Sequence, residues 1–230
     1  MVRLPEPLSR RDRQRQTREA LIFAARAVFA REGYHGANLD LIAREAGFSK
    51  GAVYSNFAGK AALFLAVMDA NVATAMPEGW NVFDQSAPTE GDTALSHEAR
   101  EAIKGFALAT LEFIATAARD EELAVELGQR MQAVIRGYTA VAVESGTDED
   151  PVPPDELGAL LAALDQGAAL LSLGGSTAID QRALRTGMQR LLVPASAEES
   201  REAEGDGVPV LHDRAMQERI AATVREWPSS

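Results

Sequence analysis

The residues between Asn38 and Lys60 have the types and spacing of two short helices joined by a tight corner. Asn38 is a favourable N-cap, and apolar residues recur after it at helical spacing. Gly47 ends this first helix, because glycine adopts the left-handed conformation of the C′ position at little cost. Phe48 can then seal the corner by a hydrophobic contact, and Ser49 caps the second helix. The chemistry open to such a unit is hydrogen bonding and ion pairing on its exposed face.

The second helix combines an apolar side with a side of small residues. A step of about 100° per residue places Val53 and Phe57 together on the side that must be buried. Small side chains opposite let the backbone approach base edges in a major groove, and longer polar side chains on the flanks reach phosphates or outer bases. Lys60 opens the next helix, where its ammonium and the free N–H groups of the helix N-terminus can hold one phosphate. The predicted DNA-binding residues are Asn38, Arg44, Ser49, Lys50, Gly51, Ala52, Tyr54, Ser55, Asn56 and Lys60.

This stretch resembles the N-terminal DNA-binding domain of the TetR family of bacterial transcriptional regulators, over about residues 15–65. The family's run is a capped helix, a Gly-hydrophobic corner, a small-residue recognition helix ending in Tyr-x-His-Phe, and a Lys that opens the fourth helix. Asn56 stands where His is more usual, which affects the one contact made there. The resemblance implies a ligand-responsive regulator, most often a repressor released from a palindromic operator by a small molecule. The matching positions are Ala43, Gly47, Phe48, Ser49, Gly51, Tyr54, Phe57 and Lys60.

The residues alone leave a second function open, that of a helical interaction protein without DNA binding, because a helical hairpin is also a common core motif. The order of features favours DNA binding, since a basic arm and a long bracing helix precede the corner and a lysine follows it. No enzyme is expected. His97-Glu98 is not part of an HExxH motif, and the chain has no P-loop, three histidines and no cysteine. No cofactor and no metal site are predicted.

The composition is that of a folded protein with an uneven distribution of charge. The 230 residues are 46% hydrophobic, which is enough for one or two domains with cores. The net charge is −11, yet residues 1–60 hold 11 of the 23 Lys+Arg and 6 of the 34 Asp+Glu, leaving 12 basic and 28 acidic residues for 61–230. A basic N-terminal part can bind phosphate while an acidic remainder limits indiscriminate binding. Without a continuous apolar segment at the N-terminus, the predicted location is cytoplasmic.

No alternating strand pattern appears, so the predicted fold class is all-α, with an N-terminal three-helix helix-turn-helix domain and a C-terminal helical bundle for ligand binding and dimerisation. Residues 1–60 are predicted to be the basic arm and helix-turn-helix domain. Residues 61–193 are predicted to be the helical ligand-binding and dimerisation domain. Residues 194–230 are predicted to be a linker and an extra C-terminal helix near 212–227.

Residues 1–17 are predicted to form a flexible arm that runs into a helix, which is clear from Arg18 and ends at Gly33. Such an arm can follow the DNA backbone or enter the minor groove, and a solvated tail is an equal alternative. Its basic residues include Arg10, Arg11, Arg13 and Arg15.

The resemblance also implies an effector pocket in the acidic body, and the residue types there suit an apolar or aromatic small molecule with few polar handles. Most of these side chains would also serve as ordinary core, and for any one of them the residue type favours the core role over the pocket. The candidate pocket residues are Trp80, Phe83, Phe106, Thr110, Phe113, Arg130, Met131 and Tyr138.

Two predicted helices, about 155–174 and 180–192, stand where the family builds a four-helix bundle from two subunits, so the resemblance implies a homodimer. The first is apolar nearly all round and should be buried on two sides. The candidate interface residues are Leu157, Leu161, Leu164, Leu171, Leu184, Met188 and Leu191.

Overall fold

The computed structural model describes residues 9–83, 97–145 and 152–192. Within these ranges the chain is helical and contains no strand, as the all-α prediction requires. The extra helix predicted near 212–227 lies outside the described residues. The described helices are α1 (Arg10–Gly36), α2 (Leu39–Glu45), α3 (Lys50–Tyr54), α4 (Lys60–Ala75), α5 (His97–Ala117), α6 (Glu121–Ser145), α7 (Pro154–Leu173) and α8 (Gln181–Leu192).

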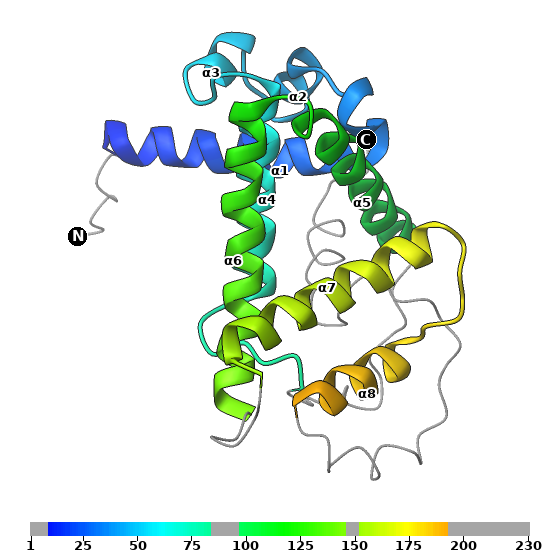
Figure 1. The fold of residues 1–230 in the computed structure, drawn as a ribbon. Helices are drawn as coiled ribbons and strands as arrows, with labels where there is room; N and C mark the ends of the chain where they lie inside the picture. Colours follow the sequence, from blue (N-terminus) through cyan, green and yellow to red (C-terminus); the bar gives the residue numbers. More distant parts are fainter. Residues whose placement is uncertain (1–8, 84–96, 146–151, 193–230) are drawn as a thin grey trace, which may run out of the picture.

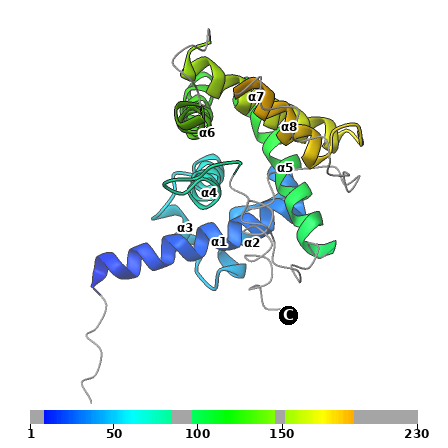
Figure 2. The same cartoon turned by 90° about the horizontal axis from the view of Figure 1, so that it is seen from below.

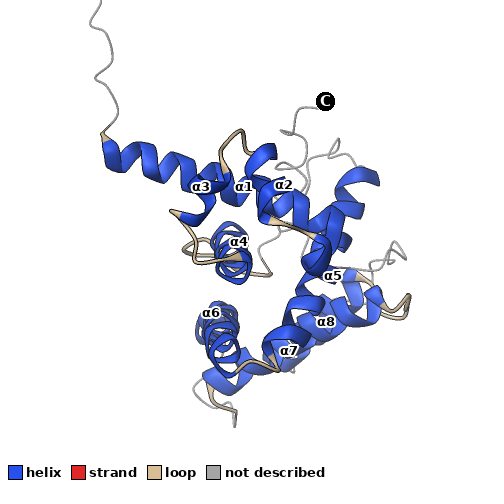
Figure 3. Ribbon diagram, turned by 90° about the horizontal axis from the view of Figure 1, so that it is seen from above, coloured by secondary structure: helices blue, strands red, loops and turns tan. Residues whose placement is uncertain are grey.

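The helices form two sides joined by α4. The helix-turn-helix elements α2 and α3 lie at one end of the molecule, above α1, while α7 and α8 lie at the other (Figure 1). Views along the perpendicular direction place α4 between the side formed by α1, α2 and α3 and the side formed by α6, α7 and α8 (Figures 2 and 3). Helix α4 therefore contacts α1 on one side and α6 on the other.

Helix α1 begins earlier than the sequence suggests. The Ser9 side chain caps it by accepting the N–H of Asp12 at 3.1 Å, so the chain from Arg10 onward is helical. The prediction of a flexible arm up to residue 17 is wrong for Arg10–Thr17, because a local Ser-x-x-Asp cap with an acidic first turn starts the helix there. Gly33 interrupts the helix at φ 72°, as predicted, and the following turn reaches Gly36.

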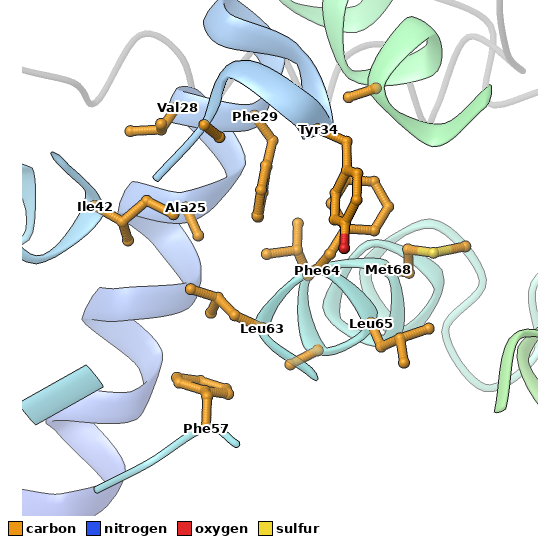
Figure 4. Close-up of a cluster of buried hydrophobic side chains, with 14 of the residues drawn as sticks. Ala25, Val28, Phe29, Tyr34, Ile42, Phe57, Leu63, Phe64, Leu65 and Met68 are labelled. Carbon is orange, nitrogen blue, oxygen red and sulfur yellow. The ribbon is translucent and has the colours of Figure 1, made fainter. Parts of the chain in front are cut away.

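The first core cluster joins the helix-turn-helix to α4 and α5. Tyr34, buried after the Gly33 kink, contacts Phe64 of α4 and Phe113 of α5 edge to face, with ring centroids 5.2 and 5.0 Å apart (Figure 4). Phe29 meets Phe64 in the same way at 4.8 Å. Aromatic pairs of this geometry add to the free energy of burial. This core cluster therefore contains residues on both sides of the predicted boundary at residue 60.

The second core cluster holds α6, α7 and α8 together with the segment after α4. Tyr138 of α6 is buried, and the Trp80 ring meets it edge to face at 5.2 Å. Leu161 of α7 and Met188 of α8 are also buried in this cluster. Met76, directly after α4, packs against it. Helix α4 thus has its first turns in one core and its end against the other.

Helices α1 and α5 cross so closely that the backbones touch. A Cβ added to Gly105 of α5 would lie 2.0 Å from the carbonyl oxygen of Ala30 in α1. Helices α6 and α7 cross equally closely at Gly158 of α7. A Cβ added there would lie 2.2 Å from the Thr139 hydroxyl of α6 and 2.6 Å from the Thr139 backbone nitrogen. Glycine is required at both crossings because any side chain would force the helices apart.

Helix α7 is the one helix in the described part of the chain whose length and composition would let it cross a membrane. It packs instead against α6 and α8 through Leu157, Leu161 and the buried Gly158. Helix α7 is thus packed on two sides, by α6 and α8, while Leu160 and Leu171 on the same helix are exposed.

Candidate nucleic-acid interface

Side-chain caps define both helices of the hairpin as the sequence predicted. Asn38 Oδ1 accepts the backbone N–H of Leu41 at 2.8 Å and starts α2. Ser49 Oγ accepts the N–H of Ala52 at 3.3 Å and starts α3. Both caps satisfy N–H groups that have no partner within the helix. Asn38 and Ser49 therefore set where each helix begins, and their remaining exposed atoms lie at the end of α2 and at the corner.

The corner between the helices is a Schellman motif. Gly47 has φ 74°, its N–H donates to the carbonyl of Arg44 at 3.1 Å, and the Phe48 N–H donates to the carbonyl of Ala43 at 2.8 Å. Phe48, which the sequence predicts to seal the corner, is 37% exposed. Backbone hydrogen bonds fix the corner, and an apolar ring is left on the surface.

Helix α3 presents the face that the sequence predicted. Val53 is completely buried and Phe57, after the helix, is nearly so. Gly51 and Tyr54 are exposed, and Ala52 is half-buried. Tyr54 is 54% exposed, so it is a surface residue and not a core aromatic. We define the α3 face as the exposed residues Lys50, Gly51, Tyr54 and Ser55.

Two predicted contact residues close the end of α3 in this structure. Ser55 Oγ donates to the carbonyl of Ala52 at 3.0 Å, and Asn56 Nδ2 donates to the same oxygen at 2.8 Å. Helix α3 is only five residues long, so these side chains satisfy a terminal carbonyl that otherwise lacks a partner. Each would have to exchange this bond for one to a base or phosphate. Sequence spacing alone did not indicate that competition.

Lys50 is paired with an acidic residue of α2. Its Nζ lies 2.9 Å from Asp40 Oδ1, with both side chains exposed. The hydrogen bond to Asp40 raises the pKa of the Lys50 ammonium, and the attraction of the carboxylate adds to it. Lys50 is therefore positioned at the junction of α2 and α3, and Asp40 competes with any phosphate that approaches it. Arg44 is exposed on the same two-helix unit.

The Lys60 ammonium has partners within the chain that the sequence did not suggest. Its Nζ donates to the carbonyls of His35 at 3.2 Å and Ala37 at 3.0 Å and lies 4.8 Å from the centre of the Tyr34 ring. Burial lowers the pKa of this ammonium, and nearby Glu112 opposes the shift. A phosphate that approaches the Lys60 ammonium, as the sequence predicts, would compete with these two carbonyls. The ammonium ties the start of α4 to the turn after α1.

Arg18 is a contact residue that the sequence reasoning missed. Its guanidinium donates from Nη1 to the carbonyl of Asn56 at 2.9 Å and lies 4.3 Å from the centre of the Phe57 ring. Arg18 thus anchors the end of α3 to the exposed face of α1. A charged residue at position 18 was visible in the sequence, but the sequence could not show its partner, which lies 38 residues away.

The first turns of α1 extend the basic surface beyond α3. Arg10, Arg11, Arg13 and Arg15 are exposed. Arg15 lies 3.2 Å from Asp12, so part of this charge is internally paired. These side chains are carried on a helix, which gives them fixed positions relative to α3 that a flexible arm would not have.

The candidate pocket residues fall into two separate groups. Phe106, Phe113 and Met131 belong to or pack against the first core cluster, where Phe106 stacks on Phe64 at 5.5 Å. Trp80, Phe83 and Tyr138 belong to the second. Two of the polar candidates have partners within the chain: Thr110 donates to the carbonyl of Phe106 at 2.9 Å, and Arg130 lies 3.0 Å from Asp69. The aromatic and Met candidates are thus divided between the two core clusters.

The candidate dimer residues also divide. Leu157, Leu161, Leu184 and Met188 are buried inside the single chain, so they offer no surface to a second copy. Leu171 and Leu191 are exposed, and Leu164 is half-buried. On α8 the buried residues are Leu184, Met188 and Leu192, while Leu191 is 38% exposed.

The fold and this face together define an all-α protein with an N-terminal helix-turn-helix. Residues 21–67 match the family model described as bacterial regulatory proteins, tetR family. The helix-turn-helix domain is therefore that of the TetR family, as the motif predicted.

Two curated relatives support this assignment. The chain is 44% identical over 57 residues to the HTH-type transcriptional activator FasR of Mycolicibacterium smegmatis, which is 25% of this chain and 26% of that protein. It is 46% identical over 54 residues to the HTH-type transcriptional regulator TtgW of Pseudomonas putida, 24% of this chain and 40% of that one. The matches thus span well under two thirds of these relatives, and their names describe regulators of transcription, not enzymes.

The whole fold also has a counterpart among solved structures. The crystal structure of a protein from Rhodococcus sp., described as a TetR-family transcriptional regulator, covers 79% of this chain and 97% of its own, with a TM-score of 0.54 and 19% identity. The likeness extends the shared all-α fold beyond the helix-turn-helix into α5 to α8.

Proposed function

We propose that this protein is a DNA-binding transcriptional regulator that acts as a homodimer on a palindromic operator in the cytoplasm, as a repressor released by a small molecule. The observation that carries the proposal is the α3 face. The apolar side of helix α3 is buried, while Gly51 and Tyr54 on the α3 face are exposed beside Lys50 and the basic start of α1. An exposed short helix with a small-residue face is suited to the major groove, and the arginines of α1 are suited to the phosphates.

Selection of bound sequences from random duplex DNA tests this proposal. We expect a palindrome whose half-sites are centred about 34–36 Å apart, or a multiple of that distance, because two copies of α3 must enter the groove on one face of the duplex. The binding constant should fall steeply as the salt concentration rises. The slope of its logarithm against the logarithm of the salt concentration reports how many phosphates the protein neutralises. Binding without sequence preference at every salt concentration would instead support the alternative, a helical interaction protein whose charge is incidental.

A leucine stripe on α7 supports dimerisation. Leu160, Leu164, Gly167 and Leu171 recur at spacings of four, three and four residues and so lie on one side of the helix. Leu160 is 49% exposed and Leu171 50%. A Cβ added to Gly167 would meet nothing within 4 Å, so a second helix can approach there. A contiguous apolar surface of this kind is typical of a protein interface.

We expect Leu171→Glu to convert a dimer into a monomer, because it places a charge in an apolar interface that two copies share. Operator affinity should fall with it, since two linked reading helices become independent. Sedimentation velocity measures the first effect and DNA titration the second. Val143→Glu is the matched control, because Val143 of α6 is 64% exposed outside the stripe. A Leu171→Glu protein that stays dimeric places the interface elsewhere.

Response to an effector fits the position of α4. A small molecule bound beside Trp80 and Tyr138 would press on Met76 at the end of α4, whose first residue Lys60 lies beside the helix-turn-helix. Ligand would then favour a position of α4 in which the two α3 helices no longer match the operator. The apolar and aromatic side chains of the second cluster suit an apolar or aromatic effector.

A further inference from the structure

The backbone of His35 is held from two sides by residues of two different helices. Its N–H donates to Glu112 Oε2 of α5 at 2.9 Å. Its carbonyl accepts from Lys60 Nζ, at the start of α4, at 3.2 Å. A single residue in the turn after α1 therefore connects a carboxylate of the body to the first residue of the helix that follows the helix-turn-helix.

The turn and the carboxylate fit each other closely. Gly33, at φ 72°, approaches Glu112 so nearly that an added Cβ would lie 2.8 Å from Oε1. Phe113, the next residue of α5, is buried against Tyr34 with ring centroids 5.0 Å apart. Glu112 is thus fixed on its helix by the packing of its neighbour, and a charged acceptor at this place is a strong partner for a backbone N–H.

Lys60 depends on the same turn for its position. Its ammonium is bound by the carbonyls of His35 and Ala37 and by the face of Tyr34, all within the segment that Glu112 anchors. Gly59 provides no side-chain cap, so this ammonium adds a polar tie between the first turn of α4 and the turn after α1, beside the apolar packing of Leu63 and Phe64. Asn38 and α2 follow directly after the same segment, so displacing the turn would displace both helices.

We propose that Glu112 is a positioning residue for DNA binding, which acts through the backbone of His35 to fix Lys60 and the start of α4 relative to the reading helix. This inference rests on the proposed function. It makes α5 a second route, besides α4, by which the body controls the helix-turn-helix. Glu112 itself touches no DNA in this arrangement.

The sign of the effect distinguishes this role from simple electrostatics. Removing an acidic residue ordinarily strengthens binding to DNA, because it removes repulsion of the phosphates. Glu112→Ala should instead weaken operator binding about tenfold, since a charge-assisted hydrogen bond is lost from the turn. Glu112→Gln keeps a carbonyl acceptor for the His35 N–H and should retain most of the affinity. Glu101→Ala, an exposed carboxylate on α5, is the charge-matched control and should bind at least as tightly as the wild type.

A double-mutant cycle with Lys60→Met separates a shared mechanism from independent damage. Lys60→Met removes the ammonium and keeps an apolar stem of similar length. If both residues act through the turn, the double variant loses about as much affinity as the weaker-binding single variant. All titrations are run well below the thermal midpoint of each variant. Losses that multiply would overturn the proposal, as would a Glu112→Ala protein that binds like the wild type.

Amide exchange gives a readout without DNA. We expect the His35 amide to be protected in the wild type, exposed in Glu112→Ala and partly protected in Glu112→Gln, with faster exchange spreading to Leu63, whose N–H bonds the Gly59 carbonyl at 3.1 Å. Unchanged exchange at Leu63 would overturn the link to α4. A wild-type protein that prefers no duplex would refute the proposed function, and the role of Glu112 in DNA binding with it.

Discussion

Gly105→Ala should lower the free energy of unfolding by about 3 kcal/mol or more, or prevent folding, because overpacking at this site acts on two backbones. The added Cβ would lie 2.0 Å from the carbonyl oxygen of Ala30 and 2.9 Å from its carbonyl carbon. Neither atom belongs to a flexible side chain, so helices α1 and α5 would have to separate. That separation would also loosen the aromatic contacts of Tyr34 and Phe113.

The matched control is Gly128→Ala on α6. A Cβ there would meet nothing within 4 Å, so the substitution should stabilise the protein by up to about 1 kcal/mol through helix propensity. Urea unfolding followed by circular dichroism measures both variants. Equal stability of the two alanine variants would show that α1 and α5 do not cross as closely as the structure has them.

Gly51→Glu should reduce operator affinity roughly hundredfold or more, because a like charge placed against phosphates or base edges costs several kcal/mol. Gly51 is exposed in the first turn of α3, and an added Cβ would meet only the Ser49 hydroxyl, at an ordinary 3.7 Å. The folded protein therefore has room for the new side chain. The loss would arise on the DNA side alone.

Gly51→Ala is the control for stability, and it also tests how closely the α3 backbone approaches the bases. It should fold at least as well as the wild type, since alanine favours the helix. A fall in operator affinity for this variant would show that the α3 backbone lies against the bases, whereas unchanged affinity would place it further away. If Gly51→Glu retains wild-type affinity at physiological salt, the α3 face is not the surface that reads DNA.

Local signals predicted the elements of the site correctly because they act over a few residues. Asn38 and Ser49 cap the helices that follow them, and Gly47 takes the left-handed conformation at the corner. The alternation of buried and exposed positions on α3 followed from helical periodicity alone. Such features need only neighbouring residues to be satisfied, so a sequence contains all the information about them.

Side-chain partners across the fold were not predictable in the same way. Lys60 was expected at a phosphate, yet its ammonium binds carbonyls 23 and 25 residues earlier in the chain. The carboxylate of Glu112 meets a backbone N–H 77 residues away. A lysine followed by a helix looks the same in a sequence whether its ammonium faces solvent or a preceding turn.

By itself, the sequence determined an all-α chain, the helix-turn-helix with its caps and corner, and the side of α3 that faces outward, because hydrogen bonds and periodicity within short segments decide these features. Only the tertiary structure decided which leucines of α7 and α8 are core and which are surface, and that the aromatic candidates for a pocket belong to two clusters. It also placed Gly105 where the backbones of α1 and α5 meet. Each of these depends on how helices distant in sequence pack against one another, and periodicity fixes the faces of a helix without fixing its neighbours.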